Sequence, residues 1–354
     1  MRLFLAKCAA LTVLASGSVA GLALLAAGRD YSRDPAYISA VIDKQDRLER
    51  LASPKIIFAG GSNLVFSQDT AALGKSMGMS PVNLGLHASI GLSWMLAQAG
   101  SALKAGDLAV VIPEFEQFID TYEGGSTIAE VLLTDPRALR HVRSWRQLRS
   151  LPEAVLPRLE TNLFWLLKRD RVLAEFSAAP WYRRTAFDEY GDVVAHLRPE
   201  HAEQYRAARE QARAGMTASR PARWGRFEDE AKVVVGLKNL ARGADQAGAK
   251  AILLFPCIPR PLFEANREAL TGLESRLRGE LGAMVQSSPS DCVLAPSEFF
   301  DSDYHLGPEA RAANVGRLRA VLAPFRKKPP EPATKAPPGP GPRKTATPAP
   351  RYSR

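Results

Sequence analysis

The stretch KIIFAGGSNLVF, residues 55–66, decides the fold. An apolar run stops at two glycines and a serine, and a helical pattern follows. Such a run is typical of a strand that is covered on both faces of a sheet. Gly60 and Gly61 permit a sharp turn, which places Ser62 at the carboxyl end of the strand and at a helix N-terminus. Ser62 is therefore either a nucleophile or an ordinary helix N-cap.

Similar apolar runs alternate with amphipathic stretches along the chain. The predicted strands are 55–59, 81–86, 108–113, 251–256 and 292–295. Helical spacing predicts a helix over 233–244, ended by Gly248, and a last helix after Gly307. This alternation predicts an α/β fold with a doubly wound parallel sheet of about five strands and helices on both sides. Functional side chains of such folds gather at the carboxyl ends of the strands.

One long segment departs from this alternation. Residues from about 120 to 223 contain Arg-rich helical stretches, such as LETNLFWLLKRDRVLAEF, and no convincing strand. The segment is too long for a plain loop. We expect a helical insertion that forms a lid or a partner surface.

The N-terminus carries an export signal. Arg2 and Lys7 precede a charge-free stretch over 8–27, which has about the ~20 residues of a membrane-spanning helix. Residues 1–28 are therefore a signal anchor, or a signal peptide cleaved near Ala26-Ala27-Gly28. Residues 29–54 are predicted as a stalk or first helix and 55–325 as the α/β domain. We expect that domain to face the periplasm or the cell exterior, either tethered to the membrane through the N-terminal helix or secreted after cleavage.

The positive charge of the chain is concentrated in its tail. The net charge is +10, and residues 326–354 hold eight Lys or Arg against one Glu, so that +7 of it lies there. This distribution argues against a nucleic-acid partner. The tail is rich in proline and poor in bulky apolar side chains, so we expect it to be disordered.

The two cysteines outside the N-terminal stretch are expected to be free thiols. If 251–256 and 292–295 are adjacent parallel strands, Cys257 lies at the end of one and Cys292 at the start of the other. Their separation would be roughly 16 Å at ~3.3 Å per residue. Bridged Cα atoms lie within about 7 Å.

Near the other end of the chain, His305 either supplies a base for Ser62 or merely caps the last helix. His305 follows the last predicted strand and precedes the last helix, so the fold brings it to the same sheet edge as Ser62. A serine alcohol needs a base to take its proton, and the base needs an acceptor that fixes its tautomer. Asp301 and Asp303 both lie close enough in sequence to supply that acceptor.

Three motifs together resemble the SGNH/GDSL hydrolase superfamily, in its divergent membrane-tethered branch. They are GGSN at 60–63, NLGLHASIGL at 83–92 and DSDYHLGPEA at 301–310. The resemblance implies a flavodoxin-like fold of SGNH type. It implies Ser62 as nucleophile, His305 as base, and the Ser62 and Gly85 amides as the oxyanion hole.

Two positions depart from the family pattern. The family places its aspartate three residues before the histidine, where this chain has Ser302; Asp301 is preferred here, with Asp303 as the alternative. The family also places an oxyanion-binding asparagine at a third strand end, which here reads VVIPEFEQF. Glu114 and Glu116 stand there, and an ionised carboxylate would repel an oxyanion. Four alternatives follow: the oxyanion hole works with the two backbone donors alone, Glu114 is directed elsewhere, burial keeps Glu114 protonated as a donor, or the protein is not a catalyst.

Several other residues are weaker candidates. The possible substrate contacts are Asn83, His87, Glu114 and Arg260, where Asn83 is alternatively structural support. Asp188, Asp192 and His196 loosely resemble metal ligands, but their spacing matches no compact site. We therefore expect neither a metal nor another cofactor.

Two classes of function follow. The first is an extracytoplasmic SGNH-like serine acyl esterase or O-acyltransferase, which the resemblance directs to a surface or secreted glycan. The second is a non-catalytic accessory protein of the same fold that binds a membrane acyl-transfer or polymer-export partner. The retained Ser62 and His305 favour the first class, and the missing asparagine favours the second.

Overall fold

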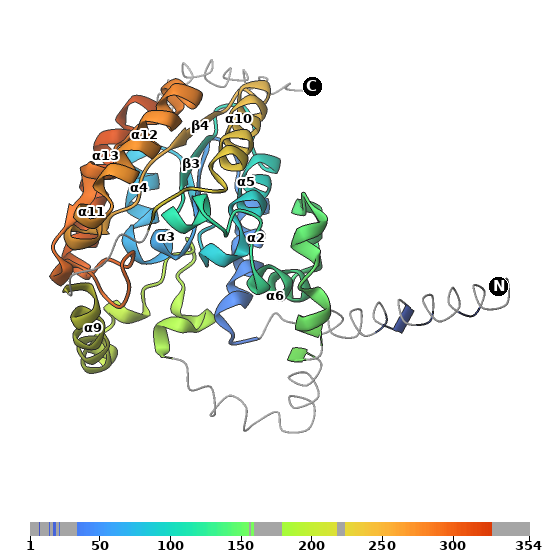
Figure 1. The fold of residues 1–354 in the computed structure, drawn as a ribbon, viewed down its shortest axis with the longest axis horizontal. Helices are drawn as coiled ribbons and strands as arrows, with labels where there is room; N and C mark the ends of the chain where they lie inside the picture. Colours follow the sequence, from blue (N-terminus) through green and yellow to red (C-terminus); the bar gives the residue numbers. More distant parts are fainter. Residues whose placement is uncertain are drawn as a thin grey trace, which may run out of the picture.

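The computed structural model describes most of the domain (Figure 1). The described residues are 34–155, 157–158, 179–217 and 224–327, with isolated positions at Lys7, Leu14, Gly17, Ser18 and Gly21. The predicted N-terminal span lies almost entirely outside them, as do residues 159–178 of the insertion and the tail beyond 327. No helix within the described parts has both the length and the apolar character needed to cross a membrane.

Four parallel strands form the central sheet, in the order β2-β1-β3-β4. They are β1 (Lys55–Gly60), β2 (Ser80–Asn83), β3 (Leu108–Ile112) and β4 (Lys250–Leu253). Every residue of β1 and β3 is buried, as their continuous apolar runs predict. The strand order reverses between β1 and β3, because β2 lies on one side of β1 while β3 and β4 lie on the other.

Helices cover both faces of the sheet (Figure 1). Alternate strand residues face opposite sides: Ile57 and Val111 belong to one core and Phe58 and Val110 to the other. The first core is covered by α2 (Ala40–Arg50), α5 (Leu92–Ser101), α10 (Glu230–Gln246) and α12 (Arg267–Leu281). The second is covered by α3 (Ser62–Ser67), α4 (Thr70–Met77) and α13 (Pro308–Leu322). The chain is thus an α/β protein whose parallel sheet is covered on both sides, which is compatible with a doubly wound fold.

The predicted fifth strand does not join this sheet. β5 (Ile258–Pro259) and β6 (Val293–Leu294) pair in parallel as a separate two-stranded sheet, and α11 (Arg260–Ala265) follows β5. The prediction of about five strands in one sheet is therefore wrong by one strand. β4 ends at Leu253, before Pro256, a residue type that has no N–H to donate to a ladder.

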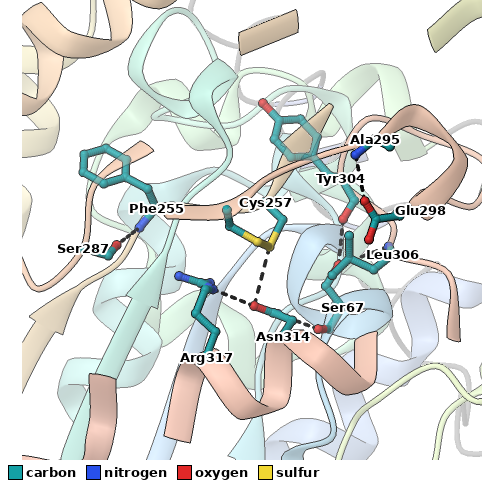
Figure 2. The surroundings of a disulfide bond; sticks show 11 residues. Ser67, Phe255, Cys257, Ser287, Ala295, Glu298, Tyr304, Leu306, Asn314 and Arg317 are labelled. Atoms are coloured by element: carbon teal, nitrogen blue, oxygen red, sulfur yellow. Dashed lines mark hydrogen bonds between the residues drawn. A yellow bond between two sulfur atoms is a disulfide. The ribbon is translucent and has the colours of Figure 1, made fainter. Parts of the chain in front are cut away.

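The prediction of free thiols is also wrong, since Cys257 and Cys292 form a disulfide (Figure 2). Their Cα atoms lie 4.6 Å apart. Ile258 of β5 pairs with Val293 of β6, and the cysteines directly precede these two residues in the chain. The error came from placing the two strands side by side in the main sheet, which put the cysteines at opposite ends.

The described parts of the insertion contain helices, 3-10 turns and isolated bridges. Its α-helices include α6 (Ser126–Thr134) and α9 (Ala202–Thr217), and residues 151–155 are also helical. Its 3-10 turns are η5 (Pro136–His141), η6 (Trp145–Leu148), η7 (Pro180–Tyr182), η8 (Arg184–Ala186), η9 (Ala195–Leu197) and η10 (Pro199–His201). The remaining 3-10 turns of the domain are η2 (Tyr37–Ser39), η3 (Ala88–Ile90), η4 (Phe115–Phe118), η11 (Gly282–Met284), η12 (Pro289–Cys292), η13 (Pro296–Glu298) and η14 (Ala323–Phe325).

Candidate active site

The candidate site lies where the strand order reverses. Ser62 is the first residue of α3, directly after β1 and Gly61. Glu114 follows β3, the strand that pairs with β1 on the other side of the reversal. Ligands of open α/β folds commonly bind at the carboxyl ends of the strands where the strand order reverses.

Ser62, His305 and Asp301 form one chain of contacts. Ser62 Oγ lies 2.9 Å from His305 Nε2, and His305 Nδ1 lies 2.6 Å from Asp301 Oδ1. A carboxylate can only accept at that distance, so Nδ1 carries a proton and Nε2 faces the serine. The structure thus gives the acceptor position to Asp301, and the extra residue between it and His305 is absorbed in the turn.

The His305 ring is held from two directions. The Phe66 ring of α3 stacks on it at a centroid distance of 3.9 Å. Ser67, at the end of the same helix, accepts from the Leu306 N–H at 3.3 Å and donates its hydroxyl to the Tyr304 carbonyl at 2.8 Å (Figure 2). The helix that begins with Ser62 therefore also fixes the residues on either side of His305.

Asp301 receives a second hydrogen bond from the insertion. The Tyr182 hydroxyl donates to Asp301 Oδ2 at 2.6 Å. Burial alone would raise the pKa of Asp301, but the hydrogen bonds of His305 and Tyr182 outweigh it and lower that pKa below its usual value. Tyr182 has no motif around it, and sequence reasoning missed it.

The second motif packs against the serine turn. A Cβ on Gly85 would lie 2.7 Å from Leu64 Cβ and 2.8 Å from the Gly61 carbonyl oxygen, so only glycine permits this approach. The Gly85 N–H donates to Asn83 Oδ1 at 2.9 Å. Asn83 is thus a structural partner of Gly85, and the amide expected in an oxyanion hole is engaged by it in this structure.

The loop 188–192 of the insertion supports Asn83 in turn. Asp192 is fully buried and accepts from Asn83 Nδ2 at 2.8 Å and from the Thr70 hydroxyl at 2.6 Å. Lys44 of α2 donates to the carbonyls of Asn83 and Gly191, at 2.9 and 2.5 Å. Asp192 is therefore a buried anchor of the second motif.

His87 lies at the rim of the site. Its Nδ1 accepts from the Ser89 N–H at 3.1 Å, so that the neutral ring carries its proton on Nε2. Partial burial and then the charge of His305 lower the pKa of His87. A neutral His87 can offer that Nε2–H to a ligand.

Glu114 contacts the Ser62 turn directly. Its Oε1 lies 3.0 Å from Ser62 Oγ and accepts from the Asn63 N–H, also at 3.0 Å. The contact depends on Gly61, because a Cβ there would overlap the Glu114 carboxyl group. Burial, and next the charge of Glu116, raise the pKa of Glu114. Glu116 itself accepts from the Tyr304 hydroxyl at 2.6 Å.

Two further candidates lie away from these contacts. Arg260 is exposed at the start of α11, where its charge acts on Glu264. His196 lies among aromatic rings, stacked on Phe300 at 5.4 Å. Within the described ranges, no group of three or more His, Cys, Asp or Glu side chains is arranged to hold a metal ion.

No protein-family model matches this chain. A search of curated proteins finds no significant match either. The assignment of function therefore depends on the geometry of the site and on the three motifs.

Proposed function

We propose that the protein is a serine acyl esterase or O-acyltransferase of the SGNH type. The observation that carries the proposal is the contact chain from Ser62 through His305 to Asp301 at the carboxyl end of β1. Serine, imidazole and carboxylate in this order supply a nucleophile, its base and the group that orients the base. Ser62 and His305 are 243 positions apart in sequence, and Asp301 and His305 are 4 positions apart. The packing of the helices alone does not require these three side chains to meet.

The chemistry would proceed in two steps. Ser62 Oγ attacks the carbonyl carbon of an ester while its proton passes to His305 Nε2, and the alcohol leaves with that proton. Water or a second hydroxyl then gives its proton to His305 and attacks the acyl-serine, which releases Ser62. Hydrolysis and transfer use the same residues and differ only in the second acceptor.

The first candidate donor for the oxyanion is the Ser62 N–H, in the first turn of α3, which has no hydrogen-bond partner among the described residues. Gly85 packs against Leu64 and the Gly61 carbonyl of the serine turn, and it would contribute its N–H if Asn83 released it. His87 would contribute its Nε2–H. Each such donor commonly contributes about 10²–10³ in rate.

The setting proposed is the extracytoplasmic face of a membrane. The charged and apolar pattern over 1–28 supports export, and the Cys257–Cys292 disulfide fits an oxidising compartment. The resemblance to SGNH proteins suggests a surface or secreted glycan as the substrate. A membrane acyl-transfer partner would supply the acyl group in the transferase case.

A non-catalytic accessory role is the second candidate. The contact of Glu114 with Ser62 Oγ favours it, because an ionised carboxylate at this place opposes an oxyanion and competes with His305 for the serine proton. In that case the fold would serve to bind a membrane acyl-transfer or polymer-export partner.

One experiment separates the two. The full-length protein in mild detergent is incubated with a fluorescent fluorophosphonate, alongside Ser62→Ala, His305→Gln and the matched control Ser89→Ala. We expect labelling of the wild type and of the control, none of Ser62→Ala, and labelling slower on the order of 10²-fold for His305→Gln. Absence of labelling in the wild type, or equal labelling of Ser62→Ala, would overturn the proposed nucleophile.

A further inference from the structure

The Ser62 hydroxyl has one proton and two neighbours that can accept it. His305 Nε2 lies 2.9 Å and Glu114 Oε1 lies 3.0 Å from Ser62 Oγ. If His305 is neutral and Glu114 is ionised, both neighbours are acceptors and only one of the contacts is a hydrogen bond. Both become hydrogen bonds when the site holds one further proton, on Glu114 or on His305 Nε2.

The Asn63 N–H identifies which oxygen faces the serine. It donates to Glu114 Oε1, the same atom that contacts Ser62 Oγ. A carboxyl oxygen can accept from Asn63 and still either accept from Ser62 or carry a proton toward it. The oxygen of an amide in this place can only accept from both. Glutamate at position 114 is therefore able to change its role, whereas glutamine is not.

We propose that Glu114 is a catalytic residue that switches the Ser62 hydroxyl between an idle and a reactive orientation. This inference rests on the proposed function of Ser62 as nucleophile. When Glu114 is protonated, its O–H donates to Ser62 Oγ and the serine proton is directed to His305. When Glu114 is ionised, it accepts the hydrogen bond of the Ser62 hydroxyl in place of His305, because a charged acceptor forms the stronger hydrogen bond.

The protonated form also supports the reaction. Ser62 Oγ bonds to the acyl carbon, its proton moves to His305 Nε2, and the leaving alcohol takes that proton. The Glu114 proton stays in place throughout and is neither consumed nor produced. A neutral carboxylic acid beside the reacting oxygen avoids the repulsion that an ionised carboxylate would exert on the oxyanion.

The surroundings of Glu114 favour the protonated form. The titratable groups that face it are Glu116 from its own segment, Tyr304 and His305 from the loop before α13, and Tyr37 from η2. The Glu114 side chain is 6% exposed, and burial with the charge of Glu116 raises its pKa. His305, when charged, acts in the opposite direction. Acylation should therefore fall toward high pH as Glu114 ionises.

The test measures the rate of acylation by the fluorophosphonate as a function of pH in the full-length protein. In the wild type the rate is expected to fall toward high pH as Glu114 ionises. Glu114→Ala removes the competing acceptor, so its rate should not fall toward high pH. The acylation rate of Glu114→Gln should be lower than that of Glu114→Ala, on the order of tenfold or more near neutral pH. The glutamine oxygen still accepts the hydrogen bond of the Ser62 hydroxyl and so directs its proton away from His305.

A purely structural role for Glu114 predicts the reverse order. The isosteric Gln would then be the milder change, and both variants would keep the pH profile of the wild type. That result would overturn the inference and leave the nucleophile standing, whereas an unlabelled wild type would overturn both.

A second measurement does not require the Ala variant to fold. Infrared difference spectra of the wild type against Glu114→Gln should contain a carboxylic-acid carbonyl band that disappears over the pH range in which acylation falls. A band absent at every pH would contradict the switch.

Discussion

At the scale of single residues, Asp301 is the group that orients the His305 ring. It holds Nδ1 at 2.6 Å and is itself held by the Tyr182 hydroxyl. Asp303, two residues later, is also buried. The turn between them thus determines which carboxylate serves the base, and the spacing in the sequence left both open.

Asp301→Asn should impair acylation far more than Asp303→Asn. The amide can present its NH₂ to Nδ1, which stabilises the ring tautomer that carries its proton toward Ser62. We expect a rate of fluorophosphonate labelling lower by roughly 10²-fold or more for Asp301→Asn. Asp303→Asn is the matched control and should stay within about threefold of the wild type. Equal losses in the two variants would show that Asp301 has no special role.

At the scale of elements, the insertion is part of the site support. Its loop 188–192 accepts hydrogen bonds from β2 and α4: the Asn83 N–H donates to the Tyr190 carbonyl at 2.9 Å, and the Thr70 N–H donates to Asp192 at 2.7 Å. Arg311 of α13 lies 3.4 Å from Asp192. This buried carboxylate therefore joins the insertion to both ends of the domain.

Asp192→Ala should destabilise the fold strongly. It removes the acceptor of the Thr70 N–H and hydroxyl, one of the two acceptors of the Asn83 amide, and the carboxylate that pairs with the Arg311 guanidinium. Removal of one member of such a pair commonly costs about 3–5 kcal/mol. The free energy of unfolding from urea titration checks this expectation. Glu189→Ala, whose side chain is 75% exposed, is the matched control and should change stability by less than about 0.5 kcal/mol. Equal stability of the two variants would show that the Asp192 network contributes little.

At the scale of the whole molecule, the disulfide joins the starts of β5 and β6 and packs beside α13. Cys257 Sγ lies 3.5 Å from Asn314 Oδ1, and the Asn314 amide donates to the Ser67 carbonyl at 2.7 Å (Figure 2). Ser67 is the same residue that fixes the loop of His305. The disulfide and the loop that carries His305 are therefore connected through Asn314 of α13 and Ser67.

Loss of the disulfide should lower the stability of the domain. The bridge closes a loop with a sequence separation of 35, for which chain entropy predicts a stabilisation of about 3–4 kcal/mol. The double variant Cys257→Ala and Cys292→Ala should unfold at lower urea and should not respond to reductant, whereas the wild type should respond. Unchanged stability of the wild type under reductant would contradict the expectation.

The sequence determined the positions of the four core strands, and it placed Ser62 and His305 at the same edge of the sheet. Continuous apolar runs predict buried strands wherever they occur, and the strand–turn–helix pattern around Ser62 is local. The position of His305 before the last helix follows from the same alternation. These features depend on interactions between neighbours in the chain, which a single sequence records directly.

Only the tertiary structure decided which distant segments meet. The pairing of β5 with β6, the disulfide, the hydrogen bond of Tyr182 and the contact of Glu114 with Ser62 all join residues at least 35 positions apart. Composition and periodicity predict that a segment is buried, but the packing of the whole chain selects its neighbour. Glu114 illustrates the difference. Its position in the sequence predicts that it follows a strand, whereas the structure shows that Gly61, which has no side chain, leaves room for the Glu114 carboxyl group beside Ser62.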